Sequence, residues 1–203
     1  ICANKKWLRE IQKRCIDNNI ELIFDEIQTG FGRTGSMFAF EMYDVTPNIL
    51  CLAKGMGGGM PIGAFISSKK NMDKLSSHPS LGHITTFGGH PVSCAAALTT
   101  FKELKNSNIL DEVSNKRQLF IDNLQHPKIK NIHGHGLMIA LEFESDHACQ
   151  SIIEETLKGG VITFYFLFNR NNMRISPPLN IQNKDIRKAC SIIKESIDKY
   201  YKE

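Results

Sequence analysis

The fold is decided by one stretch of the sequence, Ile20-Glu21-Leu22-Ile23-Phe24-Asp25-Glu26-Ile27-Gln28-Thr29-Gly30-Phe31-Gly32-Arg33-Thr34-Gly35. Residues 20–24 form a short apolar run of strand length, and the glycine-rich loop after them predicts a sharp end to that strand. Asp25, Glu26 and Gln28 occupy the end of the strand. Open α/β sheets bind their ligands at the carboxyl ends of their strands, so we expect these polar side chains to lie at a ligand site.

A lysine follows a second apolar run. Residues 49–53 have strand length, and Lys54 comes directly after them, followed by four glycines within residues 55–59. Most lysines are surface residues, so an exposed lysine at the end of a strand is the simplest interpretation. The alternative is a functional amine, because the adjacent glycines leave room for a bulky ligand.

The first half of the chain predicts an α/β domain over residues 1–108. Apolar residues at helical spacing indicate a helix that contains residues 7–15. Residues 64–67 form a third strand, and Pro91 suits the first turn of an alanine-rich helix over residues 92–104. The alternation of helices with apolar strands is typical of an α/β layout.

The second half, residues 109–203, predicts a smaller α+β domain. A hinge at residues 106–108 precedes an amphipathic helix over residues 109–124. The elements expected beyond it are strands at 128–133 and 137–143, a helix over 148–157, strands at 161–167 and 173–176, and a final helix from about residue 184 with Asn183 as its N-cap.

Composition and charge exclude several classes of protein. The chain has 203 residues, of which 41% are hydrophobic and 23% charged, and this composition is that of a globular protein. The net charge of +4 is spread evenly over both halves, so no basic stripe indicates a nucleic-acid partner. The lysine- and arginine-rich residues 184–188 alternate with apolar residues and are interpreted as the solvated face of a helix.

The sequence also predicts neither a membrane segment nor a metal site. The longest apolar run, residues 161–168, is far shorter than the roughly 20 residues that span a bilayer, and the N-terminus has no signal layout. The six cysteines are scattered without a C-x-x-C pair, which indicates neither a zinc site nor a disulfide framework. We expect a soluble, cytoplasmic protein with reduced thiols.

Two nucleotide-binding interpretations of the glycines are weak. Residues 30–35 match G-x-G-x-x-G after a strand. However, polar residues occupy the end of that strand, and residues 36–40 do not begin like a capped helix, as a dinucleotide fold requires. The second glycine cluster, residues 55–63, lacks the lysine and hydroxyl pair of a phosphate-binding P-loop.

Four separated motifs closely resemble those of class-III pyridoxal phosphate (PLP) aminotransferases. The first is the loop at residues 25–35. The others are Thr46-Pro47-Asn48-Ile49-Leu50 with Ala53-Lys54-Gly55 and Gly57-Gly58-Gly59-Met60-Pro61-Ile62-Gly63-Ala64, then Thr85-Thr86-Phe87-Gly88-Gly89-His90-Pro91, and finally Met173-Arg174-Ile175-Ser176-Pro177-Pro178-Leu179. Together they cover nearly the whole chain at a spacing similar to that of the family.

The resemblance implies a fold-type-I PLP transferase, with the latter part of a large α/β domain at residues 1–108 and a small C-terminal α+β domain at residues 109–203. It also implies that Lys54 forms the Schiff base with the cofactor aldehyde and then shuttles the substrate's proton. Asp25 would pair with the pyridine nitrogen and keep it protonated. Gln28 would form a hydrogen bond on the side of the ring hydroxyl.

The same resemblance assigns the phosphate and substrate contacts. Thr86, with Thr85, would bind the cofactor phosphate from the neighbouring subunit, which implies a homodimer with its site at the subunit interface. Arg174 would bind the substrate's α-carboxylate with its planar guanidinium, a geometry that lysine cannot match. Glu26 and Arg33 are interpreted as structural anchors of their loop.

The implied activity is transfer of an amino group from an amine or amino acid to a 2-oxo acid such as 2-oxoglutarate, in the style of ornithine, acetylornithine and 4-aminobutyrate transaminases. The sequence leaves the amino donor open. Family chains are considerably longer, so we expect this chain to be the C-terminal half of such an enzyme, without its phosphate-cradling glycine loop. A PLP-dependent decarboxylase or aminomutase of the same fold, or a non-catalytic remnant, are the alternatives.

Overall fold

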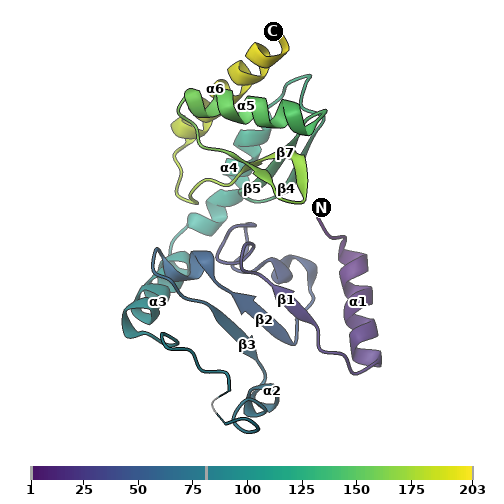
Figure 1. Cartoon of the computed structure of the whole chain (residues 1–203), viewed down its shortest axis with the longest axis vertical. Coiled ribbons are helices and arrows are strands. Elements are labelled where there is room, and N and C mark those ends of the chain that lie inside the picture. The colour runs from purple at the N-terminus through teal and green to yellow at the C-terminus, as the bar shows by residue number, and fades with distance from the viewer. Residues whose placement is uncertain (1, 81, 203) are drawn as a thin grey trace. The chain divides into compact units, whose positions relative to one another are not determined.

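The computed structural model describes residues 2–80 and 82–202, which form two compact units (Figure 1). The first unit contains residues 3–32 and 36–108. The second unit contains residues 109–202 together with Cys2 and residues 33–35. The chain therefore divides between residues 108 and 109, and a three-residue piece of the glycine-rich loop belongs to the second unit.

The first unit is built on a three-stranded sheet with the order β1-β2-β3. Strands β1 and β2 are parallel, and β2 and β3 are antiparallel. The three strands lie side by side in Figure 1. The elements of this unit are α1 (Lys5–Asp17), β1 (Ile23–Asp25), the 3-10 helix η1 (Ala39–Tyr43), β2 (Ile49–Leu52), the 3-10 helix η2 (Lys54–Gly57), β3 (Ala64–Ser67), α2 (Lys69–Asp73) and α3 (Pro91–Asn106).

The predicted first strand is shorter than its apolar run. The run begins at residue 20, but β1 begins at Ile23. The backbone N–H of Leu22 donates to the side-chain oxygen of Asn48 at 2.8 Å, so this group bonds a side chain instead of a neighbouring strand. The helix that contains residues 7–15, the strand at residues 64–67 and the break at residues 106–108 agree with the prediction.

The second unit is an antiparallel sheet with the order β4-β5-β7-β6, packed against helices. Helix α5 packs on β7 and on α6, and α6 packs on α4 (Figure 1). The elements are α4 (Ile109–Asn123), β4 (Asn131–His135), β5 (Met138–Glu142), α5 (Asp146–Lys158), β6 (Phe164–Phe166), β7 (Asn169–Ile175) and α6 (Asn183–Lys202).

Several boundaries in the second unit differ from the sequence prediction: β4 covers Asn131–His135 where residues 128–133 were predicted, and β7 begins at Asn169 where residue 173 was predicted. Two further differences have local reasons. The strand predicted from residue 161 begins at Phe164, because the N–H of Val161 donates to the carbonyl of Thr156 at the end of α5. Asn183 is the first helical residue of α6 and not its N-cap. The carbonyl of Gln182 accepts from Asp185 and Ile186, which starts the helix one residue earlier.

The principal hydrophobic core lies in the second unit. Alternate residues of β5, Ile139 and Leu141, are fully buried, as expected for a strand with one face on a core. Helix α6 contributes Ile186, Cys190, Ile193 and Ile197 at helical spacing. The first unit instead leaves large apolar side chains exposed on its sheet and on α3, among them Ile23, Phe65, Ile66, Val92 and Leu98.

Candidate functional site

Asp25 and Lys54 lie at the ends of two neighbouring parallel strands. Asp25 is the last residue of β1 and pairs in register with Cys51, and Lys54 follows the end of β2 by two residues. Parallel strands end at the same edge of a sheet, so both side chains belong to its carboxyl edge, where α/β sheets bind ligands. Gln28 lies in the turn directly after β1, and all three residues are exposed.

Lys54 has an unusual backbone and an amine without a partner. Its φ angle is +46°, in the left-handed region that residues other than glycine rarely adopt. Among residues 2–80 and 82–202, no hydrogen bond or ion pair involves its amine, whereas Lys69 pairs with Asp73 at 3.0 Å. A backbone held in a sparsely populated conformation points to a functional constraint at this lysine.

Two of the four glycines after Lys54, Gly57 and Gly58, are required by protein packing, which corrects the sequence interpretation in part. A Cβ atom on Gly57 would lie 3.0 Å from Ile62, and one on Gly58 only 2.1 Å from the hydroxyl of Thr100 in α3. Of this cluster, only Gly59 would place a Cβ atom with nothing within 4 Å. Gly58 therefore lets the Lys54 turn pack closely against α3.

The loop after Asp25 is held by a buried carboxylate. Glu26 is 3% exposed and accepts hydrogen bonds from the hydroxyl of Thr29 at 3.1 Å and from the N–H groups of Ala39 and Phe40 at 2.6 and 2.7 Å. One carboxylate oxygen of Asp25 accepts from the N–H of Ile27 at 3.0 Å. Glu26 is thus the loop anchor that the sequence predicted, and only one oxygen of Asp25 is engaged by the loop.

Arg33 anchors the far end of the same loop. Its guanidinium donates to the carbonyls of Leu137 and Pro177 at 3.1 and 2.6 Å, and its own carbonyl accepts from the N–H of Leu137 at 3.0 Å. Burial lowers the pKa of Arg33 from its ordinary value. The loop continues through bends to η1 and opens no α-helix, so it lacks the helix of a dinucleotide site.

Thr85 and Thr86 lie in the exposed segment before α3. The carbonyl of Thr85 accepts from the N–H of Gly88 at 3.2 Å, which closes a turn. In the described parts of the chain, no hydrogen bond joins either threonine to Asp25, Gln28 or Lys54. The fold thus brings Asp25, Gln28 and Lys54 to one edge of the sheet, while both threonines belong to the segment before α3.

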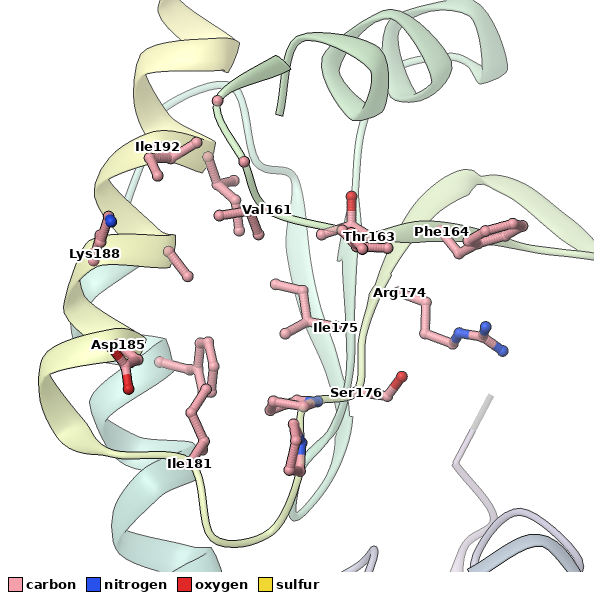
Figure 2. A pocket seen from close by; sticks show the side chains of 18 residues that line it. Val161, Thr163, Phe164, Arg174, Ile175, Ser176, Ile181, Asp185, Lys188 and Ile192 are labelled. Carbon is pink, nitrogen blue, oxygen red and sulfur yellow. The ribbon is translucent and has the colours of Figure 1, made fainter. Parts of the chain in front are cut away.

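Arg174 belongs to the second unit, next to the last residue of β7, opposite Ala140 of β5 and Phe164 of β6. It borders a cavity of about 640 Å³ between α6 and the segment before β6 (Figure 2). Figure 2 shows its guanidinium directed away from α6. Its Nε atom and the hydroxyl of Thr163, which also borders the cavity, are buried and have no hydrogen-bond partner among the residues that the structure describes.

Two aromatic residues near Arg174 were not predicted from the sequence. The rings of Phe164 and Phe166 lie 5.9 and 6.0 Å from its guanidinium carbon. The aromatic composition of residues 164–168 was the available signal, but only the register between β6 and β7 identifies which rings face the arginine.

Membrane spans and metal clusters are absent from the part of the chain that the structure describes. No helix in the described residues is long and apolar enough to cross a membrane. Within residues 2–80 and 82–202, no group of histidine, cysteine, aspartate or glutamate side chains could hold a metal ion. All six cysteines are free thiols.

Comparisons with known proteins converge on one group. The family model described as "Aminotransferase class-III" matches residues 1–197. An acetylornithine aminotransferase of Clostridium acetobutylicum is 36% identical in an alignment of 203 positions, which covers 97% of this chain and 51% of that protein. A putrescine aminotransferase of Pectobacterium atrosepticum is 38% identical in an alignment of 206 positions, which covers 98% of this chain and 43% of that protein.

Solved structures give the same result. The ornithine aminotransferase of Toxoplasma gondii superposes with a TM-score of 0.87 at 32% identity, over 97% of this chain and 47% of that one. An aminotransferase of Bacillus anthracis superposes with a TM-score of 0.90 at 25% identity, over 98% of this chain and 49% of that one. The chain thus spans about half the length of the relatives that it matches.

Proposed function

This chain belongs to the class-III aminotransferase family, and we propose that it forms the lysine-bearing part of an enzyme that transfers an amino group to a 2-oxo acid. Class-III aminotransferases depend on PLP. The observation that carries the proposal is the unpartnered amine of Lys54, placed with Asp25 at the carboxyl edge of two parallel strands. An amine and a carboxylate at this edge are the two groups that a PLP ring requires.

The residues of the first unit fit the cofactor chemically. Lys54 has a free amine, which would hold the cofactor covalently. Asp25 has one carboxylate oxygen engaged by Ile27, and the other would hold a proton at the pyridine nitrogen. Gln28 would donate to the ring hydroxyl without adding a second charge. The buried anchor Glu26 keeps the loop that carries these groups in place.

The chain's own residues would then divide the work of the reaction. PLP, when bound, supplies an electron-withdrawing ring that stabilises negative charge at the substrate's α-carbon. Lys54 would remove the proton from that carbon as a general base, which must lie within hydrogen-bond distance of the proton. Arg174 would orient the substrate through two parallel hydrogen bonds to its carboxylate.

The finer assignments are part of the same proposal. Thr85 and Thr86 would bind the phosphate group across the interface of a homodimer. The names of the relatives include acetylornithine, ornithine and putrescine, each of which carries a primary amine on a short aliphatic chain. We therefore propose such an amine as donor, 2-oxoglutarate as acceptor and the cytoplasm as the location.

The test is an amino-transfer assay on the intact PLP-loaded protein, with several aliphatic amines as donors and glutamate formation from 2-oxoglutarate as the readout. Lys54→Ala should lower the rate about 10²- to 10⁴-fold, the usual contribution of a general base. Lys69→Ala is the matched control, because Lys69 forms a surface ion pair with Asp73, and it should leave the rate unchanged. Carbon dioxide released without glutamate would instead assign a decarboxylase.

A further inference from the structure

Arg174 carries a charge that no acidic residue within the described parts of the chain neutralises. No aspartate or glutamate among residues 2–80 and 82–202 forms an ion pair with its guanidinium. Arg170, on the same strand, differs: it lies 5.2 Å from the ring of Tyr165 and 3.5 Å from a carboxylate oxygen of Asp146. Both arginines of β7 thus have aromatic neighbours, but within the described residues only Arg170 has a carboxylate partner.

The register of β6 and β7 places two rings beside Arg174. Phe164 lies directly opposite Arg174 in the ladder, and Phe166 lies two residues further along the same strand. Their ring centroids are 5.9 and 6.0 Å from the guanidinium carbon, within the range of a cation–π contact. Tyr165, between them, packs against the hydrophobic core of the unit. Figure 2 shows Phe164 and Arg174 on the same side of their strands.

An aromatic neighbour and an acidic neighbour have different effects on an arginine. The negative face of a ring attracts the cation but accepts no strong hydrogen bond, so the N–H donors stay available. A carboxylate would attract the cation and also occupy those donors. The Nε atom is buried, so an incoming carboxylate would bind the two terminal nitrogens end-on.

We propose that Phe164 and Phe166 are positioning residues, which hold the Arg174 guanidinium in place and leave its terminal donors free for a substrate carboxylate. The inference rests on the proposed function in one respect, namely that the carboxylate bound by Arg174 is the substrate's. Loss of a ring should therefore weaken the binding of carboxylates and leave the chemical step unchanged.

The variants are Phe164→Leu, Phe166→Leu and the double variant, tested in the intact protein. Leucine keeps an apolar side chain but removes the ring. Phe164→Tyr keeps the ring and is the conservative rescue. Phe168→Leu is the matched control, because Phe168 is fully exposed in the loop between β6 and β7 and has no ring contact with Arg174.

Two readouts test the proposal. The KM for 2-oxoglutarate should rise about 2- to 5-fold for each ring removed, the value of an exposed cation–π contact, with kcat unchanged. The dissociation constant of glutarate, measured by calorimetry without turnover, should rise by the same factor. Phe164→Tyr and Phe168→Leu should match the wild-type protein in both measurements.

The calorimetric arm separates failure of this inference from failure of the proposed function. If the protein binds glutarate but transfers no amino group, the rings can still be tested by binding alone. Unchanged glutarate affinity in the double variant would overturn the inference. So would an equal loss in Phe168→Leu, or absence of glutarate binding to the wild-type protein.

Discussion

Replacing Gly58 with alanine should destabilise the protein because the new methyl group would collide with α3. The Cβ atom would lie 2.1 Å from the hydroxyl oxygen of Thr100, which donates to the carbonyl of Ala96 at 2.9 Å. Relief of this overlap costs about 1–3 kcal/mol, as other overpacked sites do. The φ angle of +57° adds about 1–2 kcal/mol for a residue with a Cβ atom. We expect a total loss of about 2–5 kcal/mol in the free energy of unfolding.

The assay is equilibrium unfolding in urea, with Gly58→Ala made in the wild-type protein and in Thr100→Ala. Removing the hydroxyl leaves the Cβ atom of residue 100 at 3.5 Å, an ordinary contact. Gly58→Ala should therefore cost only the backbone term, about 1–2 kcal/mol, in the second background. An equal cost in both backgrounds would refute the reasoning, because the loss could not then come from the contact with α3.

Three further predictions concern the anchors and the buried thiols. Arg33→Met should lower the free energy of unfolding by about 3 kcal/mol, because it leaves the carbonyls of Leu137 and Pro177 without their charged donor. Unfolding in urea measures this loss, and a loss smaller than that of an ordinary surface substitution would contradict the prediction. Glu26→Gln should lower the free energy of unfolding by about 2 kcal/mol in the same assay, because an amide NH₂ would face N–H donors. An unchanged free energy of unfolding would show that Glu26 does not anchor the loop. Burial raises the pKa of Cys149 to about 12 and that of Cys190 to about 11. A thiol reagent at about pH 8 should therefore label the exposed Cys94 rapidly and these two cysteines only on unfolding, as measured by mass spectrometry. Rapid labelling of Cys149 and Cys190 in the folded protein would contradict their burial.

The sequence located the elements of the fold well and their ends less well. Apolar runs of strand length correspond to β1, β2 and β3, because burial of alternate or successive side chains is a local pattern. The observed strand ends differ from the predicted ones where a backbone N–H group bonds to an acceptor outside the sheet. The side chain of Asn48 takes the N–H of Leu22, and the carbonyl of Thr156 takes that of Val161. Asn48 lies 26 residues from Leu22 in the sequence, so this bond leaves no local signal.

The residues of the candidate site were also predicted only in part from the sequence. Asp25, Gln28 and Lys54 were predicted as neighbours because strand ends meet at one edge of a parallel pair. Gly58 was misread as ligand space because its neighbour, Thr100, lies in a helix far along the chain. The rings beside Arg174 depend on the register of β6 against β7, which contains an irregularity at Tyr165 and Phe166. The roles of Thr85, Thr86 and Arg174 remain predictions from the family resemblance.

The central claim is that Lys54 is the amine that binds the cofactor. The most direct measurement is borohydride reduction of the intact PLP-loaded protein, followed by proteolysis and mass spectrometry of the labelled peptide. We predict one stoichiometric label on Lys54, because its amine lies at the carboxyl edge of the sheet and has no partner among the described residues. A label on Lys69 or Lys70, or equal incorporation into Lys54→Ala, would contradict this claim.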